Sequence, residues 1–259
     1  MTERIGDVHI DRDGHIGLVT IRKPPVNSVS VELMRDLADA LEGLDKDGVT
    51  RAVILTTEGK VFCAGADLSG RASEVGLDAR TSNPLYEQAV RLYSTELPIV
   101  AAIQGAAVGA GLGLALAADF RVAAPEAKFA ANFTKLGFHP GFGLTYTLPR
   151  LIGRQNAAQM FLTGGRYDTD AALRMGLVDE VTDSADLLAH AHARAEAIAE
   201  NAPLAVRSTR KTLRADLAAG VKAATDHEFV EQQWLMKTED FKEGVKSVAE
   251  RRPGKFKGK

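Results

Sequence analysis

Apolar and polar residues alternate along the N-terminal half of the chain in a way that predicts short strands separated by helices. Apolar runs predict strands at residues 15–21, 51–56, 99–103 and 120–123. Ser30 can cap a helix over residues 31–44, where leucines recur on one face at Leu33, Leu37, Leu41 and Leu44. Pro84 opens a second predicted helix that runs to about Thr95. Strands that alternate with helices favour a parallel sheet in an α/β fold.

The pattern changes after about residue 171 and becomes mainly helical. Helical spacing of apolar residues predicts helices at residues 185–200, 205–219 and 223–237, and one short strand near residues 177–181. No low-complexity linker separates the two halves. We therefore expect an α/β core over residues 1–195 and a closely packed helical region over residues 196–259.

One uncharged segment, residues 99–118, is about long enough to cross a bilayer. It contains Gln104 and glycines at positions 105, 109, 111 and 113, and glycine at that density weakens a helix. A buried strand, a glycine-rich turn and a buried helix explain this segment better. We therefore predict no membrane span.

Composition narrows the classes of function. The chain has 259 residues, of which 45% are hydrophobic, so it can bury a full core. A formal net charge of -2 gives no electrostatic case for binding nucleic acid. Cys63 is the single cysteine, and the N-terminus has no apolar run of the kind found in secretory signals, so we expect a cytoplasmic protein. The basic residues at 251–259 are either solvated or hold an anion.

Several common catalytic motifs are missing from the sequence. There is no phosphate-binding loop of the Gly-x-x-x-x-Gly-Lys type and no Gly-x-Ser-x-Gly nucleophile elbow. The glycine run at 109–113 fails the dinucleotide pattern because Leu114 stands where a small residue is required. His227-Glu228 lacks a second histidine at zinc spacing, so we interpret this pair as structural or surface residues and predict no metal site.

Two turns remain as candidates for chemistry. Residues 62–68 follow the strand predicted at 51–56, and residues 105–113 follow the strand predicted at 99–103. Small residues in such turns leave backbone N–H groups accessible, and two N–H groups that point at one oxygen form an oxyanion hole. A purely structural role for either turn is the alternative interpretation.

Both turns, in this order and spacing, resemble the crotonase superfamily, also called the enoyl-CoA hydratase/isomerase family. Phe62-Cys63-Ala64-Gly65-Ala66-Asp67-Leu68 is similar to its first oxyanion loop, and the run from Gln104 to Asp119 is similar to its second. Further similar stretches cover nearly the whole chain, including residues 22–27, 136–153, 162–178 and 241–253. The resemblance implies a crotonase-like spiral of ββα repeats with a C-terminal helical region.

The resemblance also implies a function in fatty acid metabolism. The substrate would be an acyl-CoA thioester, with coenzyme A as part of the substrate and no separate cofactor. It implies a homotrimer or a dimer of trimers. The N–H groups of Ala66 and Ala110 would form the oxyanion hole, although the family usually has glycine at position 110. Backbone around Ala64, Asp67 and Leu68 would hold the adenine, and Gly109 would also bind the substrate. The candidates for the CoA phosphates are Arg22, Lys23 and Arg251.

The sequence departs from the family pattern at both catalytic glutamates. The resemblance places these carboxylates at positions 113 and 133, which are Gly113 and Phe133 here. Neither residue can move a proton, so hydration by two glutamates is not expected. Phe133, with Phe129, is instead expected to shape an apolar pocket for the acyl group. His139 is the leading replacement base because histidine titrates near neutral pH, although a structural role is the alternative.

Other titratable residues near the predicted pocket are weaker candidates for the missing base: Glu74, Asp78, Tyr86, Glu87 and Tyr146. Asp67 and Asp119 are expected to support the scaffold. Three hypotheses follow from this pattern. The first is an enoyl-CoA hydratase, and the second is another crotonase chemistry (isomerase, hydrolase or decarboxylase) with a different base. The third is a CoA-ester-binding protein with little catalysis.

Overall fold

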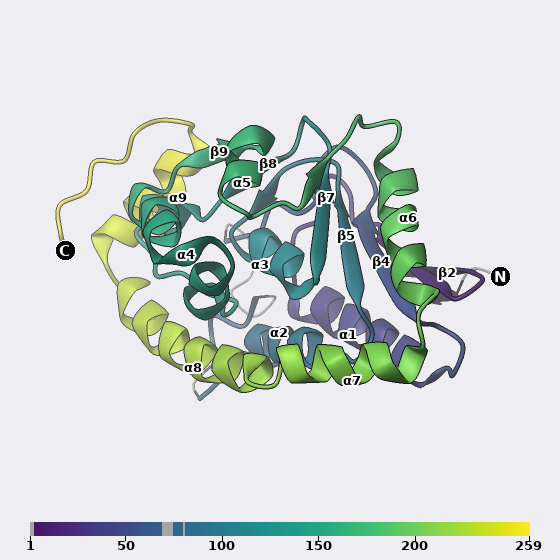
Figure 1. Cartoon of the computed structure of the whole chain (residues 1–259). Coiled ribbons are helices and arrows are strands. Elements are labelled where there is room, and N and C mark those ends of the chain that lie inside the picture. The colour runs from purple at the N-terminus through teal and green to yellow at the C-terminus, as the bar shows by residue number, and fades with distance from the viewer. Residues whose placement is uncertain (1–2, 69–74, 80) are drawn as a thin grey trace.

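The structure is a computed structural model that describes residues 3–68, 75–79 and 81–259. Its main sheet has seven strands in the order β1-β2-β3-β4-β5-β7-β10 (Figure 1). The first three strands pair antiparallel, and every pairing from β3 to β10 is parallel. Their bounds are β1 Glu3–Ile5, β2 Val8–Asp13, β3 Ile16–Ile21, β4 Ala52–Thr57, β5 Ile99–Ile103, β7 Phe120–Ala123 and β10 Glu180–Val181. The predicted parallel α/β fold is confirmed.

A smaller sheet of three strands, in the order β6-β8-β9, carries the segment after β5. Its strands are β6 Ala107–Val108, β8 Lys128–Ala130 and β9 Arg166–Asp168. The helices are α1 Val31–Lys46, α2 Pro84–Tyr93, α3 Ala110–Ala117, α4 Leu144–Thr163, α5 Thr169–Arg174, α6 Leu187–Ala199, α7 Pro203–Leu213, α8 Leu217–Leu235 and α9 Glu239–Ala249, with a 3₁₀-helix η2 at Asn132–Leu136.

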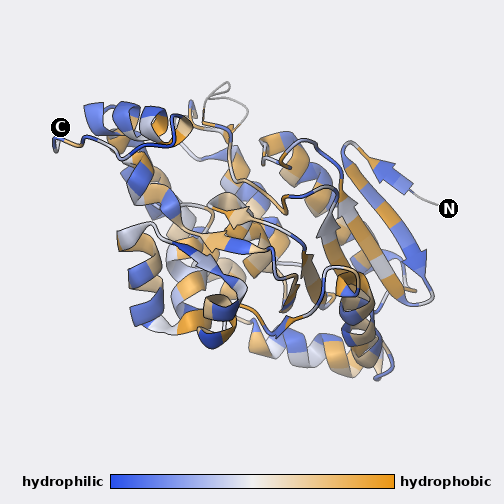
Figure 2. Cartoon of the chain, turned by 90° about the horizontal axis from the view of Figure 1, so that it is seen from above, coloured by the Kyte–Doolittle hydropathy of each residue, from blue (hydrophilic) through white to orange (hydrophobic). Residues whose placement is uncertain are grey.

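The central strands are buried on both faces because helices cover each side of the sheet. Alternate residues of a strand point to opposite faces. On β4, Val53 and Leu55 join the large core on the side of α1, α2 and α3, whereas Ala52 and Ile54 pack against α6. Figure 2 shows hydrophobic residues along the central strands, and both hydrophobic and hydrophilic residues on the helices around them. This burial explains why β4 and β5 are continuous apolar runs in the sequence.

Local signals predict the N-terminal helices well. Ser30 caps α1 and accepts a hydrogen bond from the Leu33 N–H at 3.2 Å.

Residues 99–118 form β5, a turn, β6 and α3, as expected for a buried strand, turn and helix. Within the described ranges, no helix is both long and apolar enough to cross a membrane.

Two elements of the structure have no counterpart in the sequence prediction, and one predicted helix boundary is wrong. The antiparallel pair β1–β2 was not expected. Helix α4 was also not expected, because Pro149 and Gly153 interrupt its pattern, and Gly153 has a φ of 79° at a kink. The helix predicted over 205–219 ends at Leu213, and α8 already begins at Leu217. The division of the chain at residue 195 stays a prediction.

Candidate functional site

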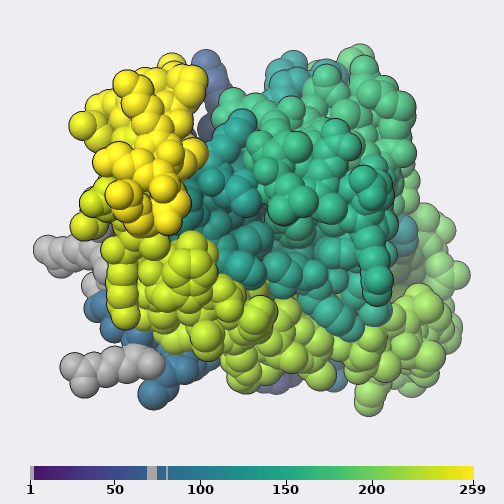
Figure 3. All heavy atoms as spheres, turned by 90° about the vertical axis from the view of Figure 1, so that its left-hand side faces the viewer, coloured from purple at the N-terminus to yellow at the C-terminus, as the bar shows by residue number. Residues whose placement is uncertain are grey.

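A cavity of about 240 Å³ lies where the two predicted turns meet the C-terminal half of the chain. The turns contribute Ala64, Gly65, Ala66 and Leu68 on one side and Val108, Gly109 and Ala110 on the other. Helix η2 contributes Phe133, and α9 contributes Val245, Val248 and Ala249. In Figure 3, α9 and the C-terminal tail lie beside the middle segment of the chain, and α9 contacts η2. Segments from four distant parts of the sequence therefore line this cavity.

Backbone hydrogen bonds join the two turns. The Cys63 N–H donates to Ala106 O at 2.9 Å, and the Val108 N–H donates to Cys63 O at 3.0 Å. A methyl group on Gly111 would lie 2.2 Å from Cys63 O, so only glycine permits this approach. Cys63 is itself buried, and burial raises the pKa of its thiol to about 11. Cys63 is therefore a neutral packing residue at physiological pH.

The N–H groups of Ala66 and Ala110 are at this junction. Ala110 is the first residue of α3, and Gly109 before it has a φ of 54°. A methyl group added to Gly65, the residue before Ala66, would lie 3.6 Å from the Ala110 nitrogen. Neither N–H has a hydrogen-bond acceptor among the described residues. Two unused donors, one of them at a helix N-terminus, therefore lie at the wall of the cavity.

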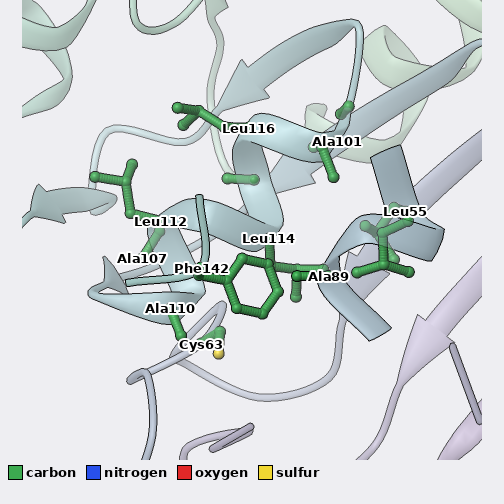
Figure 4. Packing of buried hydrophobic residues seen from close by; sticks show 14 of the residues in the cluster. Leu55, Cys63, Ala89, Ala101, Ala107, Ala110, Leu112, Leu114, Leu116 and Phe142 are labelled. Atoms are coloured by element: carbon green, nitrogen blue, oxygen red, sulfur yellow. The ribbon is translucent and has the colours of Figure 1, made fainter. Parts of the chain in front are cut away.

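Phenyl rings lie at or against the two positions where the family resemblance placed carboxylates. Gly113 is on α3, and a Cβ there would be 2.5 Å from Cδ1 of Phe142. Figure 4 shows the Phe142 ring lying against α3 beside Leu114. Phe133 lines the cavity itself and is 8% exposed. A larger side chain at position 113 is thus excluded by packing, and position 133 presents an aromatic ring.

We expect Gly113→Ala to lower the free energy of unfolding by about 1–3 kcal/mol, because the added methyl group overpacks the contact with Phe142. Gly43→Ala on the exposed face of α1 is the matched control, since a Cβ there meets nothing within 4 Å. The control should raise the free energy of unfolding by about 0.5–1 kcal/mol, because alanine is the better helix former. Urea unfolding measures both changes, and stabilisation by both substitutions would contradict this packing argument.

The predicted phosphate-binding residues do not line the cavity. Arg22 pairs with Glu58 at 2.9 Å, and the two side chains are 43% and 65% exposed. The Lys23 Nζ donates to the Ser30 hydroxyl at 3.0 Å. Arg251 follows α9, is exposed and has a φ of 54°. Asp67 is exposed beside Leu68, which does line the cavity. The structure thus brings Ala64, Leu68, Gly109 and Phe133 together and leaves these charged residues outside.

The candidate bases are also dispersed. His139 lines a separate hollow with Trp234 and Leu162, and its Nδ1 is 2.8 Å from Pro140 O. The Tyr146 hydroxyl donates to Asp216 at 2.8 Å. Glu87 and Asp78 are exposed, and Glu74 lies outside the described residues. Among the described candidates, only Tyr86 lines the cavity.

Tyr86 belongs to a hydrogen-bond chain that passes through Gln232 of α8 to the loop at His139. Its hydroxyl donates to Gln232 Oε1 at 2.6 Å, and Gln232 Nε2 donates to His139 O at 3.0 Å. Burial raises the pKa of Tyr86, so the phenol stays protonated at physiological pH. Sequence analysis missed Gln232, because a glutamine inside a long helix gives no signal of the distant groups it contacts.

Glu228, one helical turn before Gln232, is fully buried. Its carboxylate accepts hydrogen bonds from the N–H groups of Gly143 and Thr145 at 2.8 and 3.0 Å, which caps the start of α4. Burial raises the pKa of Glu228 above its usual range. The structural role expected for this residue is consistent with these contacts, and α8 thereby fixes the loop that carries Phe142.

Comparison with known proteins agrees with the fold. The sequence profile described as enoyl-CoA hydratase/isomerase matches residues 11–259. The chain belongs to this family. It is 38% identical over 254 residues to Bacillus subtilis YngF, which carries the enoyl-CoA hydratase/isomerase name, and the match covers 95% of this chain and 96% of YngF. It is 31% identical over 251 residues to the short-chain-enoyl-CoA hydratase of Clostridium acetobutylicum, covering 96% of each.

Solved structures of the family share this crotonase fold. An enoyl-CoA hydratase/isomerase from Pseudoalteromonas atlantica superposes with a TM-score of 0.86 at 30% identity, covering 97% of this chain and 100% of that one. A carnitinyl-CoA dehydratase from Mycobacterium avium superposes with a TM-score of 0.83 at 31% identity, covering 98% and 99%. The enzymatic character predicted from the sequence is confirmed: this family member is an enzyme of the hydratase/isomerase type.

Proposed function

We propose that this enzyme binds an acyl-CoA thioester with its carbonyl oxygen between the N–H groups of Ala66 and Ala110. The observation that carries the proposal is the pair of unused donors at the wall of one cavity, on turns joined through Cys63. Negative charge develops on a thioester oxygen when the adjacent carbon gains enolate character. Two preorganised N–H groups stabilise that charge, and the N-terminus of α3 adds its dipole.

The remaining steps depend on which group carries the proton. Among the described residues, no carboxylate lines the cavity, and Tyr86 is the one titratable side chain that does. Of the described residues, Tyr86 is the candidate for proton transfer, and a bound water or the substrate itself are the alternatives. We infer that the protein acts as a hydratase or isomerase without the paired glutamates of its family, and that it assembles as a trimer or a dimer of trimers. Arg22, Lys23 and Arg251 keep a proposed role at the CoA phosphates.

Turnover of defined thioesters tests this function. The purified protein is offered enoyl-CoA, β-keto-CoA and malonyl-type CoA esters, and products are identified by mass spectrometry. We expect one class to react at a rate far above the uncatalysed reaction. If CoA esters bind and none reacts, the protein is a CoA-ester-binding protein and the enzymatic proposal fails.

A further inference from the structure

The described wall of the cavity carries no charged side chain. Its polar members are four neutral residues, Asn83, Tyr86, Asn132 and Gln232. Gln232 is already engaged, because its Oε1 accepts from Tyr86 and its Nε2 donates to His139 O and Pro140 O. Asn83 Oδ1 caps α2 through the Leu85 N–H at 2.9 Å. Asn83 Nδ2, by contrast, is buried and has no hydrogen-bond partner among the described residues. The described wall therefore offers neutral amide donors, but no cation, to an ionised group.

Phe133 limits the space next to the two amide donors. Its Cζ lies 3.7 Å from where a methyl group on Gly109, the residue immediately before Ala110, would be. On the C-terminal side, Val245 and Val248 of α9 line the same cavity. The cavity volume, about 240 Å³, is below the roughly 300–1,000 Å³ of typical ligand pockets. An acyl group that begins at the amide donors therefore meets an aromatic ring within a short distance.

Neutral walls also discriminate by charge. Moving a carboxylate from water into an apolar site costs far more than moving a methyl group unless a cation or several donors compensate. The ordinary counter-ions for such a group, arginine and lysine, are absent from the described wall. The Tyr86 proton is directed at Gln232, so the amides of Asn83 and Asn132 are the remaining side-chain donors of the described wall. A terminal carboxylate on the acyl chain would thus meet no cation among the described lining residues, and only the neutral side-chain amides of Asn83 and Asn132 could donate to it.

We propose that Phe133 sets the acyl specificity of this enzyme, so that the site takes short, uncharged acyl groups and rejects long ones and those with a terminal carboxylate. The inference rests on the proposed function, because it assumes that the thioester lies at Ala66 and Ala110. It gives position 133 a role in selection in place of the proton transfer that a glutamate there would perform.

Equilibrium binding of three thioesters tests this inference without requiring turnover. Butyryl-CoA and succinyl-CoA have the same number of acyl carbons and differ at the terminal group, and decanoyl-CoA tests length. For the wild-type protein we expect butyryl-CoA to bind about 100-fold more tightly than succinyl-CoA and about 10-fold more tightly than decanoyl-CoA. Isothermal titration calorimetry or competition with a fluorescent CoA ester measures these ratios.

Phe133→Ala removes the ring. The ratio of the affinity for decanoyl-CoA to that for butyryl-CoA should rise at least about 10-fold relative to wild type, while the affinity for succinyl-CoA stays low. Phe133→Leu, which loses less packing, should show a smaller change in the same direction. Phe161→Ala is the matched control, because Phe161 is half-buried on α4 and does not line the cavity. The control should keep the wild-type order of the three ligands.

The outcomes separate this inference from the proposed function. Equal binding of butyryl-CoA and succinyl-CoA by wild type, or an unchanged length preference in both Phe133 variants, would overturn the inference and leave the thioester site intact. If none of the three thioesters binds wild type, the proposed function fails and the specificity inference fails with it.

Discussion

Ala110→Pro is expected to lower kcat/KM by about 10²–10³-fold, because proline removes one of the two N–H groups proposed to hold the thioester oxygen. The substitution suits this position structurally. Ala110 is the first residue of α3, where proline is well tolerated. Proline disfavours helical backbone angles in the residue that precedes it. That residue, Gly109, has a ψ of -120°, which is not helical. Steady-state kinetics on the thioester that reacts best measures the loss.

Two comparisons distinguish loss of the donor from blocked access. Ala110→Gly keeps the N–H and should retain activity within a few-fold of wild type. In the proline variant, kcat should fall more than thioester affinity weakens, because the oxyanion contact is strongest in the transition state. A proline variant that folds and turns over at the wild-type rate would remove Ala110 from the proposed oxyanion hole.

Asp119→Ala is expected to lower the free energy of unfolding by about 3–5 kcal/mol, because it leaves buried arginines without their carboxylate. Asp119 accepts from Arg210 Nε and Arg214 Nη1, each at 2.9 Å, and from the Ile99 N–H at 2.8 Å. The side chains of Arg210 and Arg214 are only 8% and 12% exposed. Burial lowers the pKa of Arg210, which indicates how costly its charge is without a partner.

Asp226→Ala provides the control for this loss of an ion pair. Asp226 pairs with Lys222 on the surface of α8, and both side chains are more than half exposed. Exposed pairs of this kind contribute about 0.3–0.5 kcal/mol. Urea denaturation of the two variants at the same protein concentration should therefore give losses that differ by several kcal/mol. Losses of similar size would show that the Asp119 cluster is not the linkage that holds α7 to the sheet.

Local patterns in the sequence predict those parts of the fold that depend on neighbours in the chain. The cap at Ser30 and the apolar strand β4 each carry their signal within a few residues. The C-terminal half depends on distant contacts instead. Pro149 and Gly153 interrupt the helical pattern of α4, so the sequence does not predict this helix. Its start is instead capped by Glu228, which is 85 residues away in the sequence. Tertiary contacts of this kind leave no local mark in the sequence.

The candidate site divides in the same way. The two turns are recognisable because close backbone approach requires small residues, as Gly65 and Gly111 show. The rest of the cavity is not, because Gln232, Val245 and Val248 are ordinary helical residues that become neighbours of the turns only after folding. The role of Arg22 at the CoA phosphates stays a prediction, since this residue pairs with Glu58 outside the cavity and no substrate is present to show where the phosphates lie.

Helix α9 completes the cavity with residues from the last fifteen positions of the chain, Val245, Val248 and Ala249. During translation both amide turns leave the ribosome more than a hundred residues earlier than this wall. A nascent chain can therefore fold its sheet while the cavity still lacks α9 and is open to water. Stop codons that spare most of the protein but remove α9 should abolish function as completely as early ones.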